Sequence, residues 1–151
     1  TPVSKVSWGE ENMGIRIQKR QWRDCLLLRI SGCIHARDCE RIYQQLKPDG
    51  SETMPRKLYY DLEDVPDIVM TFVEMNTMIG LRRRTYGDSN GTRIAVWAPT
   101  DITFGMSRMY SALLGQFDTV NAEVFRTRDK AADFLDMPPD VLIFPGVEMP
   151  N

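Results

Sequence analysis

The sequence predicts an α/β fold in which about five strands form a mixed β-sheet and about four helices pack on it. In residues 92–135, a strand, a Pro-Thr-Asp turn, an amphipathic helix, another strand and a closing helix follow one another. Two strands separated by one helix are the unit of a sheet with crossover connections. Two strands near the start of the chain suggest a hairpin, so we expect a mixed rather than a wholly parallel sheet.

The first half of the chain predicts three strands and a helix. Residues 13–18 alternate apolar and polar side chains, as a short strand does. Residues 25–31, CLLLRIS, are typical of a strand that is buried on at least part of both faces. From Ile34 the apolar spacing becomes helical, until Pro48 stops the turn. Residues 57–62, KLYYDL, form the third predicted strand.

Two long helices are predicted in the second half, with the fourth strand, residues 93–98, between them. The first covers about residues 68–86, and the second covers residues 102–114, with Gly115 as its C-terminal stop. The loop between the first helix and the strand, GDSNG, is rich in residues that tolerate positive φ. Helical spacing predicts the following buried positions: Ile68, Phe72, Met75, Ile79 and Arg82 on the first helix, widened by Val69, Val73 and Leu81, and Ile102, Met106, Met109, Tyr110, Leu113 and Phe117 on the second.

The end of the chain predicts a fifth strand and a last helix. Residues 123–126 belong to the strand, and Thr127 is the expected cap of a helix that ends near Leu135. We therefore expect one domain in residues 1–136. Residues 137–151 are interpreted as a C-terminal tail, because four prolines interrupt it.

The composition excludes several classes of protein. With 19 basic and 21 acidic side chains, the net charge of −2 argues against general binding to nucleic acid. No apolar run approaches the roughly 18 residues that a membrane helix needs. The beginning, TPVSKVSWGEEN, lacks the pattern of a secretory signal. Cys25, Cys33 and Cys39 are odd in number and lie in one quarter of the chain, so we expect a cytoplasmic protein.

Three segments between about residues 15 and 135 carry a family resemblance. They are LLLRISG followed by a helix, KLYYDLEDV, and RIAVWAPTDITFGMSRMYSAL followed by AEVFRTRDKAADFL. In these segments the chain resembles the SpoIIAA-like branch of the STAS superfamily, small domains related to bacterial anti-sigma-factor antagonists. The resemblance implies a STAS-like fold and a regulatory role through a protein partner. The motifs contain no catalytic residue.

The same resemblance points to one position for a regulatory phosphorylation. In the antagonists, the third strand leads to an Asp-Ser-Ser-Gly turn in which a serine is phosphorylated by the partner kinase. This chain has Val69-Met70-Thr71-Phe72 there, without the aspartate, the serines or the glycine. Thr71 is the hydroxyl that remains near the expected place, and it is the candidate for such a switch.

Two clusters contain residue types that bind metals. Cys33, His35 and Cys39 offer three soft ligands, but the preferred interpretation is two packed thiols and a histidine at a helix start. The carboxylates of Asp61, Glu63, Asp64 and Asp67 could hold a hard cation such as magnesium, but acidic residues are also favoured at helix N-termini. His35 is the single histidine, and no glycine-flanked serine accompanies it. We therefore expect no metal, no cofactor and no nucleophile pair.

Three further features allow a structural and a functional interpretation. Arg82, Arg83 and Arg84 are expected at a helix C-terminus, yet they could also meet an anion or an acidic surface. Thr100 and Asp101 follow a strand, where they cap a helix or face a ligand or partner. Five of the nine methionines lie in the two central helices, where they fill the core or line a groove for a lipid or a partner helix. They are Met70, Met75, Met78, Met106 and Met109, of which Met75 and Met106 are the candidate surface residues.

These features lead to three functional hypotheses. The leading one is a non-catalytic regulatory module that docks to another protein, or to its own copy as a homodimer. The second is a protein that binds a small apolar or lipid-like molecule, because of the methionine-rich helices. The third is an antagonist that is switched by phosphorylation of Thr71.

Overall fold

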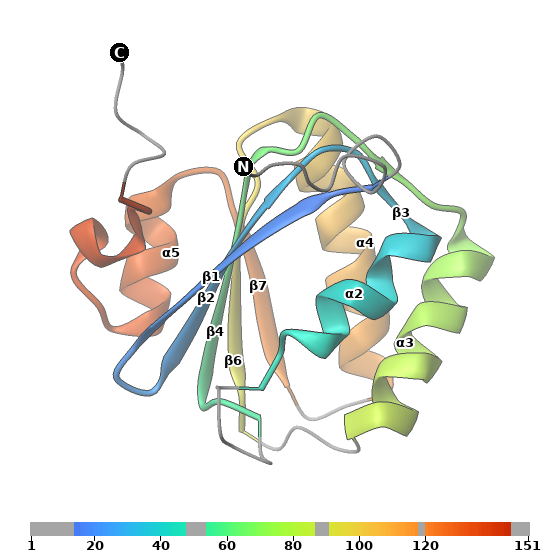
Figure 1. Cartoon of the computed structure of the whole chain (residues 1–151), viewed down its shortest axis with the longest axis horizontal. Helices are drawn as coiled ribbons and strands as arrows, with labels where there is room; N and C mark the ends of the chain where they lie inside the picture. Colours follow the sequence, from blue (N-terminus) through green and yellow to red (C-terminus); the bar gives the residue numbers. More distant parts are fainter. Residues whose placement is uncertain (1–13, 48–53, 87–90, 118–119, 146–151) are drawn as a thin grey trace, which may run out of the picture.

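A computed structural model describes residues 14–47, 54–86, 91–117 and 120–145 of the chain (Figure 1). Seven strands, four α-helices and two short 3₁₀ helices occur in these residues. In chain order they are β1 (Arg16–Trp22), β2 (Cys25–Ser31), β3 (Ile34–His35), η1 (Ala36–Asp38), α2 (Cys39–Gln44), β4 (Lys57–Asp64), β5 (Ile68–Val69), α3 (Phe72–Tyr86), β6 (Arg93–Trp97), α4 (Asp101–Phe117), β7 (Asn121–Phe125), α5 (Arg128–Leu135) and η2 (Pro139–Leu142).

Five of the strands form the central sheet, in the order β1-β2-β4-β6-β7. The first pair is antiparallel, because β1 and β2 are consecutive strands of a hairpin. The other neighbours are parallel, since a helix returns the chain to the same edge before each next strand. The predicted fold class, a mixed five-stranded sheet with four α-helices, is therefore confirmed.

The side chains of the strands alternate between two apolar layers. On β2, Leu26, Leu28 and Ile30 point to one side of the sheet, whereas Cys25 and Leu27 point to the other. We call the side that α2, α3 and α4 cover the first face, and the side that α5 and η2 cover the second face (Figure 1). Because β2 lies between two layers, each of its residues from Cys25 to Ile30 is buried.

The second face includes part of the segment after α5. Met137, Leu142 and Phe144 are buried there against the side chains of the sheet and of α5. The domain boundary placed after residue 136 stays a prediction, but residues beyond it contribute to the core. Thr127 caps α5 as predicted, because its side chain accepts a hydrogen bond from the N–H of Lys130 at 3.3 Å.

Both of the first two predicted helices begin later than expected. Residues 34–35 and 68–69 form a small parallel sheet, β3 with β5, instead of first helical turns. The N–H of Ile34 donates to the carbonyl of Asp67 at 3.1 Å, so these two backbone groups are paired between the two segments and not within a helix. As a result α2 starts at Cys39 and α3 starts at Phe72.

Two further predicted boundaries differ from the structure. The first strand runs over Arg16–Trp22 rather than residues 13–18, because β1 pairs with β2 along its whole length. Gly115 does not stop α4, which continues to Phe117. The glycines with positive φ among the described residues are Gly32 and Gly91, so Gly115 does not adopt the conformation of a helix C-cap. Met13, Pro48 and residues 87–90 of the predicted loop lie outside the described residues.

Candidate functional site

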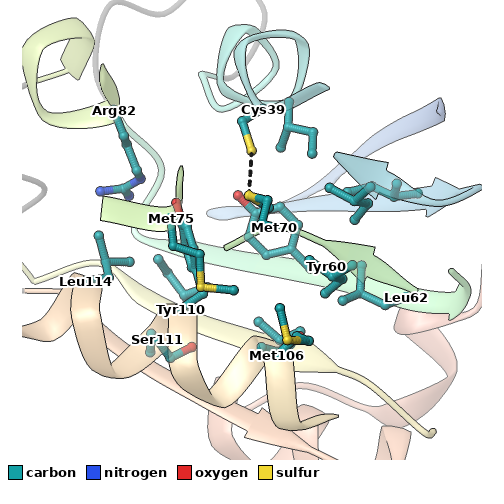
Figure 2. A pocket seen from close by; sticks show the side chains of 18 of the residues that line it. Cys39, Tyr60, Leu62, Met70, Met75, Arg82, Met106, Tyr110, Ser111 and Leu114 are labelled. Carbon is teal, nitrogen blue, oxygen red and sulfur yellow. Dashed lines mark hydrogen bonds between the residues drawn. The ribbon is translucent and has the colours of Figure 1, made fainter. Parts of the chain in front are cut away.

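A cavity of about 100 Å³ lies between the first face and its three helices (Figure 2). It is partly open to solvent, and most of its lining side chains are apolar. The lining residues from the sheet and from β3 and β5 are Ile30, Ile34, Tyr60, Leu62, Ile68, Ile94, Val96 and Ala122. Those from the helices and the segment before α3 are Cys39, Ile42, Tyr43, Met70, Met75, Arg82, Met106, Ser107, Tyr110, Ser111 and Leu114.

Met75 and Met106, which the sequence predicts as candidate residues for a ligand or partner, line this same cavity from α3 and α4. Met75 is fully buried, whereas Met106 is half-buried. Met70 lies on the same lining, and its sulfur is 3.9 Å from the Sγ of Cys39. Thr100 and Asp101 are not among the residues that line the cavity.

Hydroxyl groups from two helices meet at the cavity. The oxygens of Tyr43 on α2 and Tyr110 on α4 are 2.6 Å apart, so one hydroxyl donates a hydrogen bond to the other. Burial raises the pKa of Tyr110 to about 12, and it raises the pKa of Tyr43 as well. Burial also raises the pKa of the Cys39 thiol to about 12. These groups therefore stay protonated near neutral pH, and we assign them no role as nucleophiles.

Large apolar side chains are exposed where β5, α3 and α4 begin. The exposed fractions are 45% for Val69, 56% for Phe72, 70% for Val73 and 55% for Ile102. The start of α4 lies at the edge of the molecule where the parallel strands end, α3 begins on the flank beside it, and β5 contacts α4 (Figure 1). We call these four residues the edge surface. Open α/β sheets commonly place their binding sites at this edge.

The prediction that these four positions are buried is wrong. Helical spacing assigned Phe72 and Val73 to the buried side of α3, and Ile102 to that of α4. The spacing fails at Val69 because this residue lies in β5 and not in a helix, and it fails at the other three positions because they occupy the first turns of α3 and α4. Met109 was also predicted to be buried, and it is 40% exposed.

Threonines cap both helices that begin at this edge. Thr71 and Glu74 form a reciprocal pair: the Thr71 oxygen accepts from the Glu74 N–H at 3.1 Å, and the Glu74 carboxylate accepts from the Thr71 N–H at 2.9 Å. Thr100 accepts from the N–H of Thr103 at 3.2 Å. Asp101 is exposed and pairs with Arg126. Thr71 is exposed between Val69 and Phe72, and its phosphorylation stays a prediction.

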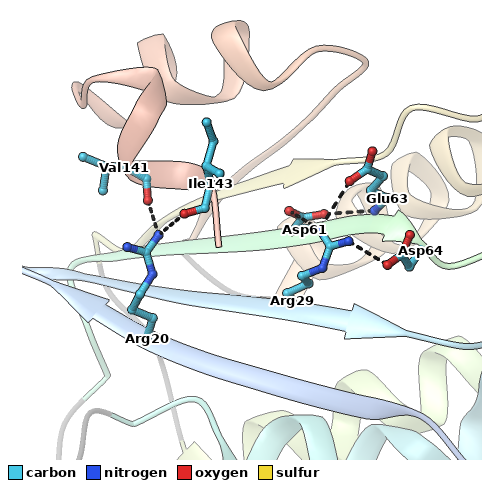
Figure 3. Close-up of polar contacts among 7 residues, drawn as sticks. All are labelled: Arg20, Arg29, Asp61, Glu63, Asp64, Val141 and Ile143. Atoms are coloured by element: carbon cyan, nitrogen blue, oxygen red, sulfur yellow. Dashed lines mark hydrogen bonds and ion pairs between the residues drawn. The ribbon is translucent and has the colours of Figure 1, made fainter. Parts of the chain in front are cut away.

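Three of the four carboxylates of the predicted cluster, those other than Asp67, surround a buried arginine (Figure 3). Arg29 of β2 lies 3.0 Å from Asp61, 3.4 Å from Glu63 and 2.6 Å from Asp64. Burial raises the pKa of Asp61, while the Glu63 N–H and the Arg29 guanidinium oppose that rise. Three carboxylates around one guanidinium form an ion-pair network, so this cluster has a structural explanation.

A second arginine in Figure 3 holds the segment after α5 against the sheet. The guanidinium of Arg20 on β1 donates to the carbonyls of Val141 and Ile143, the latter at 3.0 Å. It also lies over the ring of Phe144, with 5.0 Å between the guanidinium carbon and the ring centroid. These contacts belong to the second face and have a packing role.

The described residues contain no group of three or more histidine, cysteine or acidic side chains placed to hold a metal ion. Cys33 is exposed and Cys39 is buried, and neither is in a disulfide. The His35 N–H donates to the carboxylate of Asp38 at 2.8 Å, which ties the start of η1. Among the helices that the structure describes, none is both long and apolar enough to cross a membrane.

Sequence reasoning missed the pairing of Tyr43 with Tyr110. It gave Arg82 two interpretations, a buried position by helical spacing and a member of a basic stretch at a helix end. The structure confirms the first, because Arg82 is only 2% exposed and lines the cavity. No local pattern could have joined Tyr43 to Tyr110, since 67 positions separate them.

Two solved structures are similar to this chain. One is an uncharacterised protein of the DUF3478 family with a SpoIIAA-like fold from Shewanella loihica PV-4, at 17% identity and a TM-score of 0.49, covering 81% of this chain and 94% of its own. The other is an anti-sigma factor antagonist from Mycobacterium paratuberculosis, at 18% identity and a TM-score of 0.47; the match covers 80% of this chain and 92% of that protein.

No protein-family model matches the chain. The comparison with curated proteins also gives no match. At TM-scores below 0.5, no residue role, partner or activity is transferred from the two structural neighbours.

Proposed function

We propose that this protein is a non-catalytic regulatory module that docks to another protein through the edge surface. The observation that carries the proposal is the exposure of Val69, Phe72, Val73 and Ile102 at one edge of the molecule. Exposed apolar side chains that cluster, rather than scatter singly, mark interaction sites on soluble proteins. Large side chains such as Phe72 are suited to fill a pocket of a partner.

The charges around the edge surface indicate the chemistry of the partner. Glu63 and Asp64 are exposed before β5, Glu74 is exposed in the first turn of α3, and Asp101 is exposed at the start of α4. On the basic side, the buried Arg29 pairs with Glu63 and Asp64, Arg126 pairs with Asp101, and Arg37 of η1 is exposed. Because carboxylates predominate at this edge, the partner we propose presents apolar side chains surrounded by lysine or arginine.

A second copy of the chain fits this edge less well than a different protein does. In a symmetric dimer the same patch is present on both subunits. The carboxylates of one copy would then face those of the other, and like charges across an interface oppose association. The homodimer is therefore an alternative outcome of the experiment below.

Phosphorylation of Thr71 would regulate this docking. Its hydroxyl is exposed between two apolar residues of the edge surface, Val69 and Phe72. A phosphate there adds about −2 charge, which must lose water when an apolar partner surface covers it. It would also lie next to Glu74, whose carboxylate now accepts from the Thr71 N–H. We therefore propose that the modification releases the partner.

Site-specific photo-crosslinking in native cell extract tests the docking proposal. A photoreactive residue at Val73 is expected to give a discrete crosslink to a second protein. The same residue at Asp133, which is exposed on α5 of the second face, is the matched control and should not give that product. Phe72→Ala should remove the product by deleting the largest anchor, without unfolding the protein.

Three results would contradict the proposal. The crosslinks from both positions could be the same, the product could survive Phe72→Ala, or the crosslinked peptide could be acidic. A crosslinked product that contains only this chain would show that the edge surface forms a homodimer and does not bind a different protein.

A further inference from the structure

We infer that the cavity on the first face binds a small amphipathic carboxylate, whose anionic group meets Arg82 and whose short apolar chain lies against the sheet. This site is separate from the edge surface, and it does not depend on the proposed docking function. It narrows the class of ligand from lipid-like molecules in general to short-chain carboxylates.

The volume of the cavity sets the size of the ligand. An engineered apolar cavity of about 150 Å³ holds one benzene molecule. The cavity here has about two thirds of that volume, about 100 Å³, so it encloses about four non-hydrogen atoms, and it is partly open to solvent. It therefore encloses most of a carboxylate with four carbon atoms, which has six non-hydrogen atoms. A long acyl chain is several times larger and would not fit.

The apolar part of the ligand is selected by the wall that the sheet provides. Ile30, Leu62 and Val96 line the cavity from β2, β4 and β6. Met70 from the segment before α3 and Met106 from α4 also line the cavity, and their flexible thioether chains can adapt to different chain shapes. Removing a short alkyl chain from water into such a lining is favourable by about 0.8 kcal/mol per CH₂ group.

The polar groups of the lining include Tyr43 on α2, Arg82 on α3 and three residues on one side of α4. Ser107, Tyr110 and Ser111 are three and four positions apart, so they share a side of α4. Arg82 reaches the cavity from α3, and Figure 2 shows it on the same side as Ser111 and Leu114, away from Leu62. Mainly apolar walls with a few converging polar groups are typical of small-molecule sites.

Arg82 determines the sign of the charge that the cavity accepts. Its guanidinium is permanently protonated, it is 2% exposed, and it has five N–H donors, so a carboxylate can join the partners that it already has. Its charge acts inside the cavity, because it lowers the pKa of Tyr110 against the larger effect of burial. Arg83 and Arg84 are exposed on the next positions of α3 and add positive potential for an approaching anion.

Isothermal titration with sodium butyrate tests the inference. We expect saturable binding with a Kd of about 0.1–1 mM, a range within reach of a ligand of six non-hydrogen atoms. Butyramide, which has the same shape without the charge, is expected to bind at least tenfold more weakly. Dodecanoate is expected to bind no more tightly than butyrate, because its chain exceeds the cavity.

Two variants with one matched control locate the site. Arg82→Gln should weaken butyrate binding at least tenfold, whereas Arg83→Gln, an exposed neighbour on the same helix, should leave it unchanged. Met106→Trp should abolish binding of butyrate by filling the cavity with a larger apolar side chain. This variant keeps the test valid if Arg82→Gln does not fold, because Met106 is half-buried and carries no charge.

Several results would overturn the inference. They are an absence of saturable butyrate binding, equal affinity for butyramide, tighter binding of dodecanoate, or butyrate binding that persists in Met106→Trp. Equal losses in Arg82→Gln and Arg83→Gln would show a general charge effect instead of a site.

Discussion

The two faces of the central sheet are covered in different ways, although the same strands supply both. On the first face, α2, α3 and α4 enclose a cavity and bring tyrosine hydroxyls, a guanidinium and methionine sulfurs into the layer. On the second face, α5 and the segment after it pack alanine, leucine and aromatic side chains against the sheet. The first face therefore combines folding with space for a ligand, whereas the second face serves stability.

The difference follows from the residues that each helix turns toward the sheet. On α5 the small Ala131 and Ala132 allow a close approach to the strands, and Leu135 fills the remaining space. On α4 the side that faces the cavity carries Met106 and Tyr110, which are longer and line the cavity without filling it. Close packing is energetically sensitive to every methylene group, while a layer that already contains a cavity tolerates changes better.

Truncation of a large side chain should give the largest difference between the faces in the loss of free energy of unfolding. We expect Leu135→Ala to lower the free energy of unfolding by about 3 kcal/mol, because it opens a new cavity in the second face. Met106→Ala should cost about 1 kcal/mol, since it only enlarges an existing cavity and the side chain is half-buried. Urea denaturation of both variants measures this, and equal losses would contradict the proposed difference in packing.

The buried cysteines report how readily each layer opens. Burial raises the pKa of Cys25 on the second face and of Cys39 on the first face to about 12, so both thiols are protonated at neutral pH until their layer opens. We expect Cys39 to be alkylated about tenfold faster than Cys25 in the native protein, because opening a layer with a cavity costs less free energy. Mass spectrometry after timed labelling measures both rates, with exposed Cys33 as the internal reference. Faster labelling of Cys25 would reverse the comparison.

Removal of a helix cap should give the smallest difference in stability between the two faces. Thr71 takes part in two hydrogen bonds with Glu74 at the start of α3, whereas Thr127 accepts one bond of 3.3 Å at the start of α5. We expect Thr71→Ala to cost about 1 kcal/mol and Thr127→Ala about 0.5 kcal/mol. Thermal unfolding of each variant checks the order. Thr77→Ala, whose hydroxyl donates to the carbonyl of Val73 within α3, serves as a control without a cap.

Most of the fold could be predicted because its signals are local. The apolar run CLLLRIS, the strand KLYYDL and the strand–helix–strand–helix order after Thr92 each appear in the structure at nearly their expected bounds. The starts of α2 and α3 could not be predicted in this way. Ile34 and Ile68 look helical by spacing, and only their pairing across the fold makes them strands.

The candidate sites were less accessible to sequence reasoning. The spacing of Met75 and Met106 indicated residues that face the core, and both line the cavity. The same spacing assigned Phe72 and Val73 to the core, where they are not, because periodicity describes a helix and not the extent of the sheet beneath it.

The sequence by itself determined the class of fold, the order of its elements and the residues that alternate between its two layers, since each depends on neighbours a few positions apart. Only the tertiary structure decided which apolar side chains stay uncovered at the edge surface. It alone also decided that Arg82 of α3, Tyr43 of α2 and Tyr110 of α4 meet around one cavity. The physical reason is that burial and contact depend on how distant elements are placed, and a local pattern carries no record of that placement.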